Sequence, residues 1–399
     1  MKTTTTIPMS CPDLTAAEAD AVRDVLESNH LSLGPRLPEF EAAFASRIGR
    51  SHAVAVSSGT AALHLAVLAS GIGKGDLVIT SPFSFIASAN CLLYEGAIPV
   101  FVDVDPVTGN IDPARVDAAV SDLAGGREGR RWLPRSVRDS IRPDVAARAI
   151  LPVHAFGQPA DMTAIAETAD RHGLIVIEDA CEAIGSAHRG RETGTYGVAS
   201  CFAFYPNKQM TTGEGGMLAT DSDEVANICR SLRNQGRDVF DAWLSHSRLG
   251  YNYRLTDIAC ALGIVQLGRL DDMLARRAQV AAWYHDRLRD VARVTLPAVV
   301  PSTTRMSWFV YVVRLESRDE RRAVMRTLAD AGIPSRPYFT PIHLQPFYVE
   351  TFGYRQGDFP ITEMLGECSL ALPFSSVMTE QQVDDVCRVL DSAVAGQTT

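Results

Sequence analysis

The sequence predicts an α/β fold in which a large domain with a mostly parallel sheet precedes a smaller C-terminal α/β domain. Between about residues 50 and 220, short apolar runs alternate with segments of helical periodicity, and this alternation is typical of strand–helix units in a parallel sheet. After Tyr253 the pattern becomes mainly helical. The chain has 399 residues, and single hydrophobic cores stop growing at about 250–300 residues, which favours two domains.

The individual elements follow from this periodicity. Strands of the large domain are expected at residues 52–56, 77–80, 98–102, 149–153, 174–177 and 199–204, with helices at 61–69 and 161–172. In the second part of the chain, helices are expected at residues 257–269, continuing to 287, and at 321–331 and 381–393, with a strand at 308–315. We place the boundary near residue 262, so that the large domain covers residues 13–262 and the small domain residues 263–399.

Composition and charge argue against several classes of function. The formal net charge of −9 makes binding to nucleic acid phosphates unexpected. No apolar run reaches the ~18 residues of a membrane-spanning helix, and the N-terminus lacks the apolar core of a secretory signal. The eight cysteines are scattered without a C-x-x-C pair, which argues against a zinc site or a disulfide framework. We therefore expect a cytoplasmic enzyme or binding protein without a metal.

Residues 121–142 depart from the strand–helix rhythm. The stretch has two adjacent glycines and several arginines, among them Arg130, Arg131 and Arg135, and it shows no clear periodicity. Such a stretch is typical of a solvated surface loop. The alternative is that some of its arginines bind a phosphorylated substrate.

Residues 57–60 offer a site for an anion. Ser58, Gly59 and Thr60 lie between the expected strand at 52–56 and the expected helix at 61–69. Small hydroxylated residues at a helix start present free backbone N–H groups and a favourable dipole to a phosphate. The same residues are also compatible with a simple helix N-cap.

Two acids follow the buried strand at 174–177. Asp179 is expected at the carboxyl edge of the sheet, where the ligand sites of α/β proteins lie. A carboxylate there can keep the ring nitrogen of pyridoxal phosphate (PLP) protonated, so that the ring acts as an electron sink. A helix N-cap or a structural ion pair is the alternative for Asp179, and Glu178 is expected to be structural.

Lys208 follows an aromatic, strand-like run and precedes a turn rich in Thr and Gly, in FYPNKQMTTGEGG. The glycines allow close approach of the backbone, so the amine can be partly desolvated and attack an aldehyde. Phe85 is suited to stacking on a pyridine ring, although a core position is the alternative. Together these segments supply an amine, an anion for the ring nitrogen, a phosphate cup and a ring contact, which are the requirements of PLP.

The chain resembles the sugar aminotransferases of DegT/DnrJ/StrS type in the order of its motifs. These motifs are SSGTAALHLAV, DLVITSPFSFIASAN, GAIPVFVDVD, LPVHAFGQPADM, IEDACEAIGS, FYPNKQMTTGEGGM and GYNYRLTDIACALGIVQLGRLD. The resemblance extends from about residue 32 to 277 and, more weakly, to 373. It implies the fold type I architecture of PLP-dependent enzymes, a PLP cofactor and a homodimer.

The resemblance also implies roles for single residues by motif position. Lys208 matches the Schiff-base lysine, Asp179 the acid at the pyridine nitrogen and Phe85 the aromatic residue on the ring face. Gly59 and Thr60 match the phosphate cup.

Four further positions complete the expected site. Ala180 matches the small residue on the other side of the ring, and Asn252 matches the asparagine that reaches the phosphate from the neighbouring subunit. Arg336 and His343 are candidates for contacts to substrate phosphates. His343 is equally compatible with an ordinary hydrogen-bonded histidine.

The chain departs from the family at two of these positions. Ala203 stands where many members have serine, so the phosphate cup has one donor fewer and depends on Thr60, Ser58 or the backbone. Glu182 stands where Gln or His is common, near the phenolic oxygen of the cofactor. Its carboxyl must be protonated or otherwise neutralised there, because two adjacent anions repel. Residues 121–142 also exceed the usual length of the family.

We therefore expect a ping-pong transamination in which Lys208 binds the cofactor and acts as general base and acid. The expected amino donor is glutamate or glutamine, and the expected acceptor is a keto-sugar, with a nucleotide-linked sugar favoured. The homodimer is expected to share its active sites between subunits. Two alternatives remain open, a keto-cyclitol aminotransferase of an antibiotic pathway and a non-catalytic PLP-binding regulator.

Overall fold

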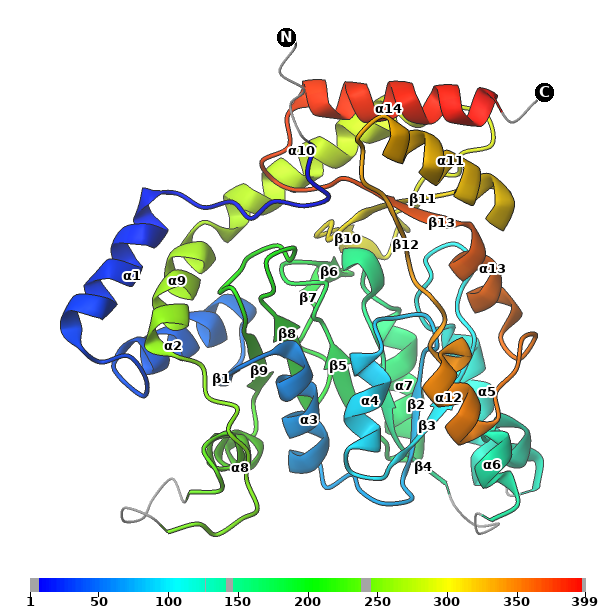
Figure 1. The fold of residues 1–399 in the computed structure, drawn as a ribbon. Coiled ribbons are helices and arrows are strands. Elements are labelled where there is room, and N and C mark those ends of the chain that lie inside the picture. The colour runs from blue at the N-terminus through cyan, green and yellow to red at the C-terminus, as the bar shows by residue number, and fades with distance from the viewer. Residues whose placement is uncertain (1–6, 126, 141–145, 238–244, 397–399) are drawn as a thin grey trace.

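The protein is described by a computed structural model that covers residues 7–125, 127–140, 146–237 and 245–396. A seven-stranded sheet of order β1-β9-β8-β5-β4-β2-β3 forms its centre (Figure 1). Its strands are β1 (His52–Val56), β2 (Leu77–Thr80), β3 (Ile98–Phe101), β4 (Ala147–Leu151), β5 (Ile175–Asp179), β8 (Ala199–Ala203) and β9 (Gly216–Thr220). β9 pairs antiparallel with β1 and β8, and the remaining neighbours pair in parallel. The predicted α/β fold with a mostly parallel sheet is confirmed.

The sequence prediction of the large sheet was wrong for one strand. A turn rich in Thr and Gly was expected after Lys208, with no strand following it, and Gly213 and Gly215 do form a turn, with φ of 80° and 159°. The chain then enters β9 at Gly216, where a Cβ would lie 2.4 Å from the carbonyl carbon of Ser58. Glycine is therefore required at the point where β9 passes the start of α3 (Gly59–Ala69).

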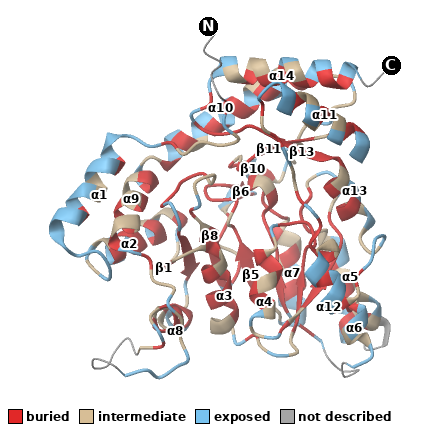
Figure 2. Cartoon of the chain, in the orientation of Figure 1, coloured by how far each residue is buried: buried red, intermediate tan, exposed pale blue. Residues whose placement is uncertain are grey.

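Helices cover both faces of this sheet, and its strands are therefore buried on both sides (Figure 2). Val54 and Val56 face a core formed with α3, α4 (Ala87–Leu93) and α8 (Asp223–Arg233). Ala53 and Ala55, which alternate with them, face α2 (Arg36–Ile48) and α9 (Asp257–Gly268). On the same face, the other strands of the sheet (β2, β3, β4 and β5) pack on α5 (Pro113–Ala124) and α7 (Met162–His172). α1 (Ala16–Ser28) lies along α9 (Figure 1).

The C-terminal part builds a second core around a three-stranded sheet of order β11-β13-β12. Its elements are α10 (Leu270–Leu288), β11 (Tyr311–Arg314), α11 (Arg318–Asp330), β12 (Arg336–Pro337), α12 (Pro346–Phe352), α13 (Pro360–Cys368), β13 (Ser369–Leu372) and α14 (Glu380–Ala395). Figure 1 shows α10, α11 and α14 together above this sheet. A small sheet of β10 (Thr303–Arg305), β6 (Ala187–His188) and β7 (Arg191–Glu192) lies between the two cores. The predicted boundary near residue 262 falls inside α9, and the division into domains stays a prediction.

Residues 121–142 are not the irregular loop that was predicted. α5 continues to Ala124, and two short helices follow, η1 (Arg127–Trp132) and α6 (Arg135–Arg138); residues 126, 141 and 142 lie outside the described part. Arg135 ties α6 to the C-terminal part, since its Nη2 donates to Oδ1 of Asp358 at 2.7 Å. A cavity of about 410 Å³ lies between these helices and the segment before α13, and four arginines line it: Arg115, Arg131, Arg135 and Arg138.

Neither a membrane span nor a metal cluster is found among the described residues. No helix there is long and apolar enough to cross a bilayer. No group of three or more His, Cys, Asp or Glu side chains there is arranged to hold a metal ion.

Candidate active site

A cavity of about 750 Å³ opens at the carboxyl edge of the large sheet. This volume lies within the range of about 300–1,000 Å³ that is usual for small-molecule sites. Most of the residues selected from the sequence meet at its wall: Ser58, Gly59, Thr60, Phe85, Asp179, Glu182 and Lys208. They come from segments up to 150 residues apart and converge because β1, β2, β5 and β8 end at one edge of the sheet.

Ser58, Gly59 and Thr60 form the N-terminal end of α3. The Ser58 hydroxyl accepts a hydrogen bond from the Ala61 N–H at 3.1 Å, so the simple N-cap interpretation of this residue is correct. The cap does not exclude an anion site, since the first N–H groups of a helix have no partner within it. Gly59 has no room for a side chain, because a Cβ there would lie 2.7 Å from the Cβ of Ala203. The helix end is therefore held tightly against the end of β8.

Asp179 ends β5 with its carboxylate at the cavity wall. Oδ2 accepts from the Ser88 hydroxyl at 2.7 Å, and Oδ1 accepts from the Cys181 N–H at 3.1 Å. Glu178, one residue earlier, points to the other side of the strand and is fully buried. It accepts N–H groups of Gly194 and Gly197, so its expected structural role is supported.

Lys208 lies in the turn after β8, with its backbone N–H bonded to the carbonyl of Tyr205 at 2.9 Å. Its side chain is 13% exposed. The ammonium nitrogen lies 3.9 Å from the centre of the Phe309 ring and 3.6 Å from Oε1 of Glu182. The amine thus occupies a largely enclosed position between a ring face and a carboxyl group.

Glu182 is buried beside this amine. Its Oε2 accepts the N–H of Phe156 at 2.9 Å. Burial raises the pKa of the Glu182 carboxyl above its usual value, although the Lys208 ammonium and the Phe156 N–H act in the opposite direction. A carboxyl whose pKa is raised is more readily protonated, which is the condition expected for a glutamate close to an oxyanion.

Phe85 and Ala180 differ in how well they match their expected places. Phe85 lies at the cavity wall with 64% of its surface exposed, so its ring is free to contact a ligand. Ala180 does not line the cavity; it packs into the core with Ile184 and other apolar residues. Cys181 lines the cavity instead. The chain turns directly after β5, so Cys181 and not Ala180 reaches the cavity, and the ring contact expected of Ala180 stays a prediction.

Besides Ala180, three predicted residues lie away from the cavity wall. Asn252 is exposed and forms an isolated bridge with Asn234. Arg336 is exposed, and its Nη1 donates to the carbonyl of Ser335 at 2.9 Å. His343 is fully buried, with Nε2 2.9 Å from Oε1 of Glu363, and burial lowers its pKa. His343 is therefore the ordinary hydrogen-bonded histidine of the two alternatives.

Sequence reasoning missed part of the wall. The missed residues include Ser88, Tyr205, Asn207, Glu214, Phe309 and, from the end of β12 and the segment after it, Pro337, Tyr338, Phe339, Thr340, Ile342 and Gln345. The FYPNK motif contained a signal for Tyr205 and Asn207, which flank the lysine. Nothing in the local pattern pointed to Phe309, which folding alone brings to the Lys208 amine.

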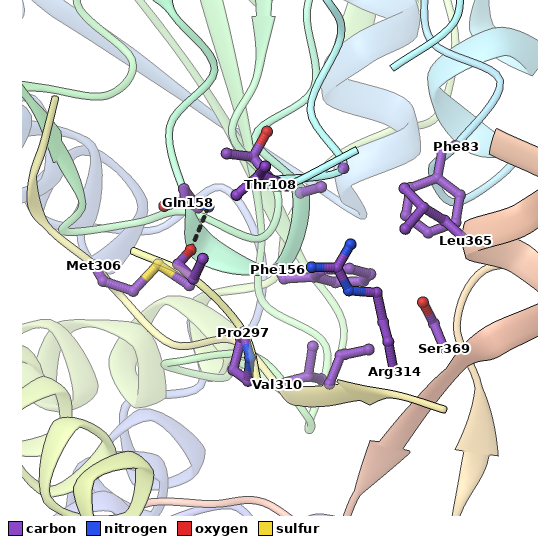
Figure 3. Close-up of a pocket in the computed structure, with 15 residues that line it drawn as sticks. Phe83, Thr108, Phe156, Gln158, Pro297, Met306, Val310, Arg314, Leu365 and Ser369 are labelled. Carbon is purple, nitrogen blue, oxygen red and sulfur yellow. Dashed lines mark hydrogen bonds between the residues drawn. The ribbon is translucent and has the colours of Figure 1, made fainter. Parts of the chain in front are cut away.

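A second cavity lies where the segment after β4 meets the C-terminal part (Figure 3). Phe156 and Gln158 line it from one side, and Val310 and Arg314 from the other. Its volume is about 40 Å³. That space suits a few water molecules and is too small for a sugar.

The residues of the large cavity fit PLP chemically. Lys208 offers an amine, Asp179 an anion, Phe85 a ring face, and the start of α3 offers N–H donors for a phosphate. Ala203, in place of the usual serine, contributes no hydroxyl, so Ser58, Thr60 and the backbone remain as the hydrogen-bonding groups of this helix end.

The chain resembles known aminotransferases over nearly its whole length. A family model described as the DegT/DnrJ/EryC1/StrS aminotransferase family matches residues 12–391. The GDP-perosamine synthase of Caulobacter vibrioides is 40% identical over 392 residues, covering 97% of this chain and 98% of the relative. The spore coat polysaccharide biosynthesis protein SpsC of Bacillus subtilis is 37% identical, covering 98% and 97%. The crystal structure of S. venezuelae DesV is 34% identical, covers 98% of each chain and superposes with a TM-score of 0.84.

Proposed function

The chain belongs to the DegT/DnrJ/EryC1/StrS aminotransferase family, whose members are PLP-dependent sugar aminotransferases. We propose that it aminates a nucleotide-linked keto-sugar and takes the amino group from glutamate or glutamine. The family resemblance and the fold type I architecture expected from the motifs are confirmed. Because the family consists of enzymes, the non-catalytic regulator is no longer a competing reading. The observation that carries the proposal is the convergence of Lys208, Asp179 and the start of α3 at one cavity.

Asp179 is proposed to hold the pyridine nitrogen of the cofactor. The Ser88 hydroxyl and the Cys181 N–H each occupy one of its oxygens, which fixes the plane of the carboxylate. Asp179 is buried, with 4% of its surface exposed. The low local dielectric strengthens the attraction between its carboxylate and a protonated ring nitrogen. When bound, PLP supplies an electron sink for the carbon that loses its proton.

Lys208 is proposed to bind the cofactor and to move the proton. As a free amine at the cavity wall, its Nζ atom would be placed to take the proton from the donor α-carbon and deliver it to the cofactor. The Phe309 ring and Glu182 limit how far the amine can move. Glu182 is proposed to hold a proton near the phenolic oxygen, which its raised pKa supports.

The identity of the acceptor rests on the relatives. The Caulobacter relative is named for a sugar linked to GDP, which supports a nucleotide-linked acceptor for this chain. The Bacillus relative is named for a spore coat polysaccharide, which supports a sugar but leaves its carrier open. A keto-cyclitol acceptor remains the second candidate, although neither name supports it.

The active site is proposed to be shared between two subunits of a homodimer. Lys208 is the only cationic side chain among the described residues that line the cavity, and three acids accompany it: Asp179, Glu182 and Glu214. The phosphates of a cofactor and of a nucleotide-linked sugar need more donors than this. Asn252 is exposed and does not line the cavity of its own chain, which leaves it available to a second copy.

A two-step half-reaction assay tests this function. The PLP-loaded enzyme is mixed with glutamate, glutamine and control amino acids, and the loss of its visible absorbance is followed. The aminated enzyme is then mixed with GDP-linked and other nucleotide-linked keto-sugars, free keto-sugars and keto-cyclitols. We expect one of the two donors and a nucleotide-linked acceptor to complete the cycle. Turnover with keto-cyclitols alone would contradict the proposed acceptor.

A further inference from the structure

Arg277, in α10, is a buried cation next to the candidate active site. Its residue surface is 2% exposed, and no carboxylate in the described part of the chain forms an ion pair with it. Burial lowers its pKa to about 10, and the charge of Asp13 offsets this only in part. A buried arginine without a paired acid is costly, and its hydrogen bonds offset part of this cost.

Those hydrogen bonds all go to backbone carbonyl groups around Lys208. Nη2 donates to the carbonyl of Lys208 itself at 2.8 Å. Nη1 donates to the carbonyls of Trp308 and Phe309, each at 3.2 Å. One planar guanidinium thus joins the turn that carries the lysine to a segment 100 residues later in the sequence.

The later of these two segments carries Phe309, whose ring contacts the Lys208 amine. The Lys208 nitrogen lies 3.9 Å from the centre of the Phe309 ring. Trp308, directly before Phe309, has a φ of 49°, a left-handed conformation that is rare for a bulky residue and is kept only where the surroundings enforce it. Arg277 bonds to the carbonyls of both residues and so helps to hold this backbone.

We propose that Arg277 is a positioning residue that sets the place of the Lys208 amine against Phe309 and Glu182 by holding the backbones of Lys208 and Phe309 together. The inference rests on the proposed role of Lys208. It implies that α10, which belongs to the C-terminal part, fixes the reactive amine of the large sheet. Lysine cannot replace arginine here, because an ammonium lacks the planar fork that reaches three carbonyls.

The test compares Arg277→Lys and Arg277→Met with Arg276→Met. Arg276 is the matched control: it is the neighbouring residue on α10, its side chain is 46% exposed, and its Nη1 pairs with Oδ2 of Asp13 at 2.9 Å. We expect Arg277→Lys to lower kcat by about tenfold or more, with the KM for the acceptor little changed, since misplacing a catalytic group acts on the transition state. Arg276→Met should keep the kcat of the wild type.

Two further readouts separate positioning from mere stability. The first is the visible circular dichroism of the bound cofactor, which should change in Arg277→Lys but not in Arg276→Met. The second uses the cofactor-free protein: trinitrobenzenesulfonate labelling followed by peptide mapping should label Lys208 faster in Arg277→Lys. The wild-type sequence has only two other lysines, Lys2 and Lys74, which serve as internal references, and peptide mapping separates the lysine introduced at position 277.

The outcomes are distinct. If Arg277→Lys shows the dichroism, labelling rate and kcat of the wild type and only a lower melting temperature, Arg277 is structural and the inference is wrong. If Arg277→Met does not fold, Arg277→Lys decides the question alone. If the cofactor proves to be attached to another lysine, the proposed site fails, while the labelling rate of Lys208 still tests whether Arg277 positions it.

Discussion

The amine nitrogen of Lys208 lies 3.6 Å from Oε1 of Glu182, and both side chains are largely buried, with 13% and 8% of their surfaces exposed. Ion pairs of this kind gain strength from the low local dielectric but pay for desolvation. For Glu182 the cost of desolvation is the larger effect, because burial raises the pKa of its carboxyl in spite of the neighbouring ammonium. The pair therefore places an amine and a carboxyl group of raised pKa side by side at the cavity wall.

Glu182→Gln should change how stability depends on pH. A carboxyl whose pKa is raised by folding favours the folded state while it is protonated, and this contribution is lost as pH rises from the usual value of about 4.5 through the folded value. Glutamine does not titrate, so the loss over this window should be smaller in the variant. Urea midpoints of the cofactor-free proteins, measured in steps from pH 4 to 8, test this. Parallel curves for both proteins would mean that Glu182 does not titrate in that range.

Lys208→Ala should abolish covalent attachment of the cofactor and turnover while leaving the fold intact. Borohydride reduction of the wild type, followed by peptide mapping, should find the cofactor on Lys208. Lys74 is an exposed residue outside the cavity, so Lys74→Ala is the control and should retain activity. Attachment to Lys74 or Lys2 would contradict the assignment.

Asp179→Asn should still bind PLP but lose most activity, because an amide cannot keep the pyridine nitrogen protonated. Loss of one such electrostatic partner in a water-excluded site typically costs ~10²–10³ in rate. Single-turnover rates at saturating donor measure the effect. A variant with turnover close to that of the wild type would make Asp179 a structural residue at the end of its strand.

The arginines of residues 121–142 should matter little for substrate binding. Replacing Arg130, Arg131 and Arg135 with glutamine should leave the KM for the acceptor within a few-fold, since none of them lines the large cavity. The exposed pair of Arg131 with Asp122 and the half-exposed pair of Arg135 with Asp358 are each worth about 1 kcal/mol or less, so the melting temperature should fall only slightly. A large rise in KM at unchanged kcat would instead show that these arginines bind the substrate.

Mixed dimers should reveal whether active sites are shared. Lys208→Ala and Asn252→Asp are expected to be inactive alone, the second because its charge repels the cofactor phosphate. In a mixed dimer one site carries both changes and the other is intact. Random pairing makes half of the dimers mixed, so co-expression should restore about a quarter of the wild-type activity. Mixed dimers without activity would mean that one chain builds each site.

The sequence by itself determined the fold class and several of the residues at the ends of strands that line the large cavity. β1 and β2 begin and end where periodicity placed them, and Asp179 and Lys208 reach one cavity because parallel strands end at a common edge. The strands follow from the local pattern of apolar residues, and the site follows from the rule that ligands bind at the carboxyl ends of parallel strands. Both can be inferred from the order of residues.

Only the tertiary structure decided what lies against these residues. Phe309 and Arg277 are about 100 and 70 residues beyond Lys208, and no local pattern links them to it. The shift from Ala180 to Cys181 at the cavity wall follows from the direction of a single turn after β5. The position of a side chain relative to distant segments results from the packing of all elements at once, and for that reason it could not be obtained from the order of residues alone.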